Sequence, residues 1–470
     1  MRRILATCLA LSLCYSLCGC KSTQTAKEGN KSVVTVADQL KIDVGEKIDA
    51  DIYIDGTYSM GGYVNFSHNT IFADAVKQIE TSITGTWKNA TVKYIKFGDR
   101  NVELSRGGFL AFQAKDFYRD VDTSLNKVID STKAGKLNII VTDLFQTNQD
   151  IESLQLALKN KCFNNEDNAV AIIGMKGHFN GEIYDIGKQQ KMVRYNSENN
   201  KDAFRPFYLV VAGNDNNVRT FVDRYSRTVE NCRIVFFSKN IGTPSLLVSD
   251  GNIKKADDKN TSTLVNLGTI PENRDGMTMN WPNYRMKLGD KMARGYMTLN
   301  SGNIVSNIPD ALYTSVKVEK MISSKASSSM VDKVLNIFKS NAKTDNISYE
   351  EVDDIDGTKL ISVKTLEGGL NGNTLEEKLQ VTINPMEFRN QKGKYRIRLN
   401  LLAERESYKK TNRVFDDWNF EDNQVLTESV LKDMGKRTQN VNRFTDLLSD
   451  MNYEIHKPGF YDLYIYFDVK

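Results

Sequence analysis

Histidine is scarce in this chain, with only three in 470 residues. His68, His178 and His456 stand apart in the sequence, and we interpret them as solvated surface groups. We therefore do not expect a zinc site or an acid–base mechanism that depends on histidine. An excess of one charge is also lacking, because 63 Lys and Arg residues face 59 Asp and Glu residues, spread along the chain. This balance gives no reason to expect nucleic-acid binding.

Long apolar runs are almost absent. The longest, residues 4–17, follows Arg2 and Arg3 and is too short to cross a bilayer comfortably, which is typical of an export signal. It ends in Leu-Cys-Gly-Cys at residues 17–20, which resembles the lipobox of bacterial lipoproteins. The resemblance implies a signal peptide at 1–19 and a lipidated Cys20, with an ordinary secretory signal as the alternative. We therefore expect a protein anchored to the cell membrane by lipid and facing outside the cytoplasm.

Few cysteines would remain after export. Beyond the lipidated Cys20, the mature chain would keep only Cys162 and Cys232, which excludes a cysteine-based metal cluster. In an oxidising exterior these two could form a disulfide, and two buried free thiols are the alternative. Their spacing does not decide between the two.

The chain divides by pattern into a polar tether at 20–45 and two folded domains, at 46–248 and 249–470. In the first, short β-rich runs alternate with amphipathic helical segments, which predicts an α/β, Rossmann-like doubly wound sheet. We expect its strands at 52–54, 92–97, 137–141, 169–173 and 207–211. We expect its helices at 72–83, 125–129, 151–158 with Asp150 as a possible cap, and 218–225. A hairpin is expected to interrupt this rhythm near 176–205.

The second domain is expected to be β-rich and sandwich-like, with strands at 312–318, 360–365, 379–383 and 395–401. Near its end, Val441, Phe444, Leu448 and Met451 fall on one helical face, and Thr438 could cap that helix. This helix and a last strand at 463–469 are expected to close the second domain.

One short motif carries chemistry. An apolar strand ends in Asp55, and hydroxyls follow at every second position, Thr57 and Ser59. The alternation points the three oxygen-bearing side chains the same way. Such an oxygen-only half-shell suits Mg²⁺ or Mn²⁺. A strand-to-helix turn that uses the same residue types is the structural alternative.

This motif resembles the metal-ion-dependent adhesion site of the von Willebrand factor A (VWA) family, which begins Asp-x-Thr-x-Ser or Asp-x-Ser-x-Ser. The family ends its fourth strand in Thr-Asp, as residues 137–143 do here, so that Asp143 matches a further ligand. Thr123, ahead of a helix, matches the family's middle threonine. The resemblance covers residues 46–245 and implies direct ligation by Asp55, Thr57 and Ser59, ligation by Thr123 in the ligand-bound state, and ligation by Asp143 through water.

Two enzyme classes share parts of the motif. Haloacid dehalogenase-like phosphatases carry Asp-x-Asp-Gly-Thr, but Tyr53 stands where the nucleophilic carboxylate is needed. Residues 57–61 resemble the Gly-x-Ser-x-Gly elbow of serine hydrolases, but the first glycine is missing and no histidine is well placed. We therefore expect binding rather than catalysis.

In the family, an acidic residue of a partner protein completes the metal's coordination. The resemblance thus implies an extracellular or envelope protein as partner, bound through Mg²⁺ or Mn²⁺. A metal-free structural or scaffold component of the cell envelope is the competing hypothesis.

Overall fold

The computed structural model describes residues 46–121, 125–133, 135–145, 148–165, 167–247, 265–274, 277–287, 292–302, 312–323, 347–371, 374–389, 391–460 and 463–470. The expected signal peptide, Cys20, the tether and Thr123 lie outside these residues. All of the described residues belong to one compact unit. None of the helices in the described ranges is long and apolar enough to span a membrane.

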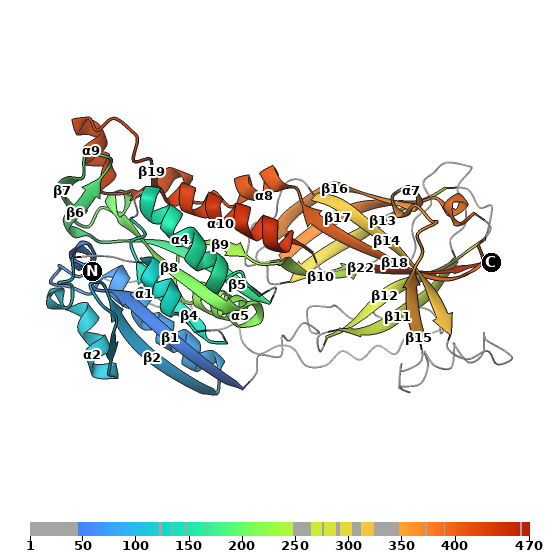
Figure 1. The fold of residues 1–470 in the computed structure, drawn as a ribbon, viewed down its shortest axis with the longest axis horizontal. Helices are drawn as coiled ribbons and strands as arrows, with labels where there is room; N and C mark the ends of the chain where they lie inside the picture. Colours follow the sequence, from blue (N-terminus) through green and yellow to red (C-terminus); the bar gives the residue numbers. More distant parts are fainter. Residues whose placement is uncertain are drawn as a thin grey trace, which may run out of the picture. The chain divides into compact units, whose positions relative to one another are not determined.

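A seven-stranded sheet organises the first half of the chain (Figure 1). Its order is β3 (Val102–Leu104), β2 (Asn89–Phe97), β1 (Lys47–Asp55), β4 (Leu137–Thr142), β8 (Arg205–Asn214), β5 (Asn168–Gly177) and β9 (Arg233–Phe237). Strand β1 pairs in parallel with β2 and β4. All five expected strand positions are confirmed.

The sheet is mixed rather than uniformly parallel. Strand β8 lies antiparallel between β4 and β5, and β9 is antiparallel to β5. The reason lies in the connection from β5 to β8, which holds the predicted hairpin, β6 (Asn180–Ile186) and β7 (Lys191–Asn196), and no α-helix. Without a helical crossover the chain returns beside β5 in the opposite direction.

Helices cover both faces of this sheet, as expected for a mixed α/β domain. On one face α1 (Ile71–Thr86) and α5 (Asp215–Ser226) bury their apolar sides in a common core. On the other, α3 (Leu125–Ser131) and α4 (Asn148–Lys161) do so. Helix α1 begins where the Thr70 hydroxyl accepts a hydrogen bond from the Ala73 amide, an N-cap. Asp150 lies inside α4 rather than capping it, because the helix begins at Asn148.

The second half is rich in strands, as predicted. Its ladder runs β11 (Val265–Arg274), β12 (Met277–Met286), β22 (Leu463–Val469), β18 (Gly393–Ala403), β21 (Gly459–Phe460), β10 (Asn240–Leu247), β13 (Ala293–Gly302), β17 (Thr374–Ile383) and β16 (Ile361–Asn371). Strand β14 (Leu312–Ser323) pairs with β18 and with β15 (Ile347–Glu351). A short α7 (Gly357–Leu360) precedes β16.

The late helix forms as predicted but packs elsewhere. It is α10 (Val441–His456), and Phe444, Leu448 and Met451 enter the core on the α4 face of the seven-stranded sheet. The segment before it comprises α8 (Arg405–Thr411), β19 (Asn419–Phe420), α9 (Glu428–Met434) and β20 (Thr438–Gln439), and Phe415 and Trp418 join the same core. The expectation that this helix closes the second domain is therefore wrong. Thr438 lies in β20, and α10 follows Asn440.

Candidate metal site at the edge of the seven-stranded sheet

The predicted ligands meet where two parallel strands end. Asp55 is the last residue of β1, and Thr142 is the last residue of the neighbouring β4. Since parallel strands end at the same sheet edge, Asp55, Thr142 and Asp143 lie together there, a common place for ligands in open α/β sheets. A 3₁₀ helix, η2 (Tyr58–Tyr63), follows the motif directly.

Hydrogen bonds tie the motif oxygens to one another. The Thr57 amide and hydroxyl donate to Asp55 Oδ1 at 3.0 and 2.7 Å. The hydroxyl oxygens of Thr57 and Ser59 lie 3.1 Å apart. The Thr142 hydroxyl donates to Asp55 Oδ2 at 3.0 Å. Asp55 thus stands at the centre of a connected oxygen cluster.

The cluster is buried on one side. Asp55 and Thr57 are 0% and 3% exposed, and Asp143 is 4% exposed. Ser59 is only half-buried, and its neighbour Tyr58 is exposed. Among the described residues of the motif, Ser59 and Tyr58 are therefore the ones that solvent reaches.

Asp55 is in an unusual electrostatic position. Burial, and then the nearby carboxylate of Asp143, raise its pKa to about 7, against the lowering effect of hydrogen bonds from Thr57 and Thr142. Two carboxyl groups with little solvent between them create a strong demand for positive charge.

A residue that sequence reasoning missed meets part of that demand. Arg205, fully buried at the start of β8, places Nη2 3.3 Å from Asp143 Oδ2. Its Nη1 donates to the carbonyls of Arg437 at 3.1 Å and Gly435 at 3.5 Å. Only its position directly before the apolar run 206–212 sets it apart in the sequence. The two carbonyls come from residues more than 200 positions away, so no local signal could have found this contact.

The loop that leads toward Thr123 is anchored at the motif. The Asp120 amide donates to the Gly56 carbonyl at 3.1 Å, and the Tyr58 amide donates to the Asp120 carbonyl at 3.1 Å. Lys96 holds the Asp120 carboxylate in an ion pair at 3.1 Å. Thr123 itself lies outside the described residues.

The donor set fits a hard divalent cation in part. Within the described ranges no group of three or more His, Cys, Asp or Glu residues could hold a metal. The cluster instead combines hydroxyls with the carboxyl group of Asp55, which accepts hydrogen bonds from Thr57 and Thr142 but forms no ion pair with the described residues, a set suited to Mg²⁺ or Mn²⁺ with waters retained. Asp143 is already paired with Arg205, so its expected role through water is the weakest part of the fit.

The remaining candidates lie away from this cluster. Cys162 and Cys232 are free thiols, and they belong to cores on opposite faces of the seven-stranded sheet. His68 is exposed, as expected, whereas His178 is half-buried and His456 is only 6% exposed, so the interpretation as a surface group is wrong for His456. His68 and His178 are neighbours, with ring centroids 5.2 Å apart.

Comparisons with protein-family models, with curated proteins and with solved structures found no match.

Proposed function

We propose that this protein is an exported lipoprotein, anchored through Cys20 and facing outside the cytoplasm, that binds a protein partner through a divalent cation. The cation would be Mg²⁺ or Mn²⁺, held in a VWA-like domain. The β-rich half would form a sandwich-like support. The partner would be an extracellular or envelope protein that offers an acidic side chain.

One observation carries the proposal: the three motif oxygens converge. Asp55, Thr57 and Ser59 are linked by contacts of 2.7 and 3.1 Å at the edge where β1 ends. The same residues in a simple turn would only need to cap local amides. A buried carboxyl whose own pKa is raised by burial gains most from a nearby cation.

Each predicted ligand would have its own role at the cation. Asp55, Thr57 and Ser59 would ligate directly, Thr123 would join when the partner is bound, and Asp143 would act through water. With a divalent cation bound and Arg205 beside Asp143, the positive charge at the site would exceed the negative charge of the two carboxylates. An acidic group from a partner would then bind favourably.

Thermal unfolding of the full-length chain in mild detergent, with Mg²⁺, Mn²⁺ or chelator, tests the proposal. A ligand that binds only the folded state raises its stability. We expect the cation to raise the unfolding midpoint of the wild type and not that of Asp55→Asn. Asp49→Asn, on the same strand and half-buried, is the matched control and should respond like the wild type. Equal responses of all three chains to the cation would contradict the site.

A metal-free scaffold is the second candidate function, and the Arg205–Asp143 pair favours it. A built-in guanidinium beside Asp143 supplies positive charge without any metal. In that case Mg²⁺ would not raise the unfolding midpoint of the wild type. It would raise the midpoint of Arg205→Gln, because this variant leaves the Asp143 carboxylate without its ion pair. A response in the wild type argues against the scaffold.

A further inference from the structure

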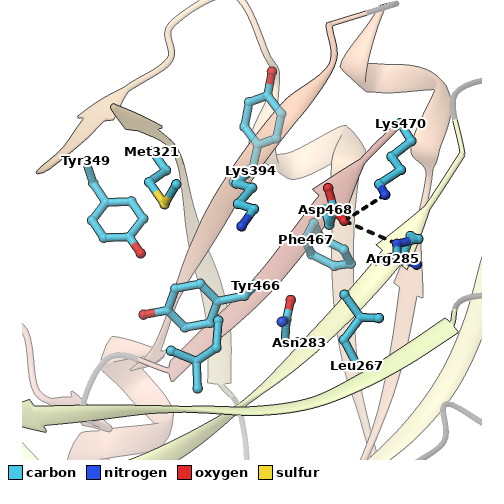
Figure 2. Close-up of a pocket in the computed structure, with 12 residues that line it drawn as sticks. Leu267, Asn283, Arg285, Met321, Tyr349, Lys394, Tyr466, Phe467, Asp468 and Lys470 are labelled. Atoms are coloured by element: carbon cyan, nitrogen blue, oxygen red, sulfur yellow. Dashed lines mark hydrogen bonds and ion pairs between the residues drawn. The ribbon is translucent and has the colours of Figure 1, made fainter. Parts of the chain in front are cut away.

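The β-rich half contains a cavity of its own, with a volume of about 190 Å³. Its lining comes from strands far apart in the sequence, including β12, β14, β15, β18 and β22 (Figure 2). None of these residues belongs to the cluster around Asp55.

One end of the cavity is cationic. Arg285 on β12 and Lys394 on β18 both stand directly opposite Asp468 on the central strand β22, so the three side chains share one face of the sheet. Arg285 Nε lies 3.2 Å from Asp468 Oδ2, and Lys470 Nζ lies 3.8 Å from the same oxygen. Figure 2 shows both contacts. Two cationic groups, Arg285 and Lys470, therefore share one carboxylate, and a third, Lys394, lies opposite it.

Lys394 is the cationic group at this end that has no ion pair among the described residues. It is half-buried, and its amine makes no hydrogen bond or short ion pair within the described part of the chain. Burial lowers the pKa of Lys394, the charges of Lys470 and Arg285 lower it further, and Asp468 opposes them. A bound anion would satisfy this amine and favour its charged form.

The other end of the cavity is aromatic and apolar. The rings of Tyr349 and Tyr466 meet edge to face, with centroids 6.3 Å apart. Next to this end, Arg396 Cζ lies 3.9 Å from the Tyr349 ring centroid, and Arg396 Nε forms an ion pair with Glu319 Oε2 at 2.5 Å. Met321 and Ile270 add apolar lining.

The size limits the ligand. A cavity of roughly 150 Å³ is enough for benzene. The observed volume therefore suits one ring with a short substituent and is small for a drug-sized molecule.

We propose that this cavity binds a small organic anion, a carboxylate carried on a single ring. The carboxylate would lie at Lys394 and Arg285, and the ring would pack on Tyr349 and Tyr466. A cationic ligand is disfavoured, because Asp468, the one acidic residue among the described lining residues, already pairs with two cations.

Calorimetric titration of the full-length chain with benzoate tests this. We expect saturable binding with a Kd of about 1 mM or tighter, and at least about tenfold weaker binding of the neutral analogue benzamide, since a charge-assisted hydrogen bond is lost. Acetate, which lacks the ring, should also bind more weakly. Equal binding of benzoate and benzamide, or no saturation by about 20 mM benzoate, would overturn the proposal.

Two variants with opposite expected signs separate binding from folding. Lys394→Met keeps the apolar stem and should weaken benzoate binding about tenfold, whereas Lys392→Met, an exposed lysine on the preceding loop, should change nothing. Asp468→Asn releases Arg285 and Lys470 and should tighten benzoate binding. A variant that merely unfolds cannot tighten it. Weaker binding in Asp468→Asn with a normal unfolding midpoint would contradict the proposed polarity.

Discussion

Arg205 Nη2 lies 3.3 Å from Asp143 Oδ2, and the two side chains are 0% and 6% exposed. The ion pair thus joins the end of β4 to the start of β8 within the protein interior. Through Nη1, the same guanidinium also holds the Gly435 and Arg437 carbonyls of the C-terminal segment. One side chain therefore connects the candidate site to a part of the chain more than 200 residues away.

Removing Arg205 should be costly. Arg205→Met leaves the Asp143 carboxylate buried without its partner, and we expect the free energy of unfolding to fall by about 3–5 kcal/mol. Urea unfolding measures it. Arg194→Met, on the exposed side of β7, is the control and should change stability by less than about 0.5 kcal/mol. A loss in Arg205→Met as small as the control's would show that the pair contributes little.

The raised pKa of Asp55 predicts a pH dependence of stability in chelator. Because the folded pKa of about 7 exceeds the unfolded value near 3.8, the folded state holds the proton more tightly. Stability from this group is fully present below about pH 4 and is lost as pH rises to about 7, by at most roughly 4 kcal/mol.

Urea unfolding across this pH range measures the loss. Asp55→Asn cannot ionise and should flatten that part of the profile, whereas Asp49→Asn should keep it. A wild-type profile that rises with pH over the same range, after the variant's profile is subtracted, would mean that Asp55 is ionised in the fold.

The packing of α10 predicts a difference between adjacent leucines. Leu448 is fully buried in the core beneath the seven-stranded sheet, whereas Leu447 is half-buried. Leu448→Ala should therefore lower the free energy of unfolding by about 2–5 kcal/mol. Leu447→Ala makes the same chemical change and should cost about 1 kcal/mol or less. Similar costs would place α10 away from this core.

Cys162 and Cys232 should be inert thiols. Burial raises the pKa of Cys162 and of Cys232 to about 12, and the two lie in cores on opposite faces of one sheet. Thiolate is the reactive form, so neither should react with Ellman's reagent in the folded chain, and both should react after unfolding without reductant. A disulfide-linked peptide pair in a non-reducing digest would contradict the structure.

Sequence reasoning reached the local features and missed the distant ones. The strands ending at Asp55 and Thr142, and the helical face containing Leu448, follow from periodicity, which depends only on near neighbours. The apolar face of α10 predicts that the helix packs on a core, but it does not predict which sheet forms that core. The prediction that α10 packs on the second domain is wrong for this reason. The antiparallel insertion of β8 depends on pairing between distant strands. Alternation brought Asp55, Thr57 and Ser59 together correctly, whereas Arg205 acts through carbonyls that no sequence window includes.

The close approach of η2 to the hairpin gives a last prediction. A Cβ added at Gly181 on β6 would lie 2.9 Å from the Gly62 Cα, a backbone atom that cannot rotate away, and 3.3 Å from Phe179 Cζ. Gly181→Ala should therefore push η2 outward and cost about 1–3 kcal/mol by overpacking. Because Ser59 lies within η2 and Thr57 directly precedes it, the shift should also reduce the response of the unfolding midpoint to Mg²⁺. Gly107→Ala is the control, since its added Cβ would meet nothing closer than 3.9 Å. If Gly181→Ala lost stability but kept the full Mg²⁺ response, the cation would be bound without help from η2, and Ser59 would not be a ligand.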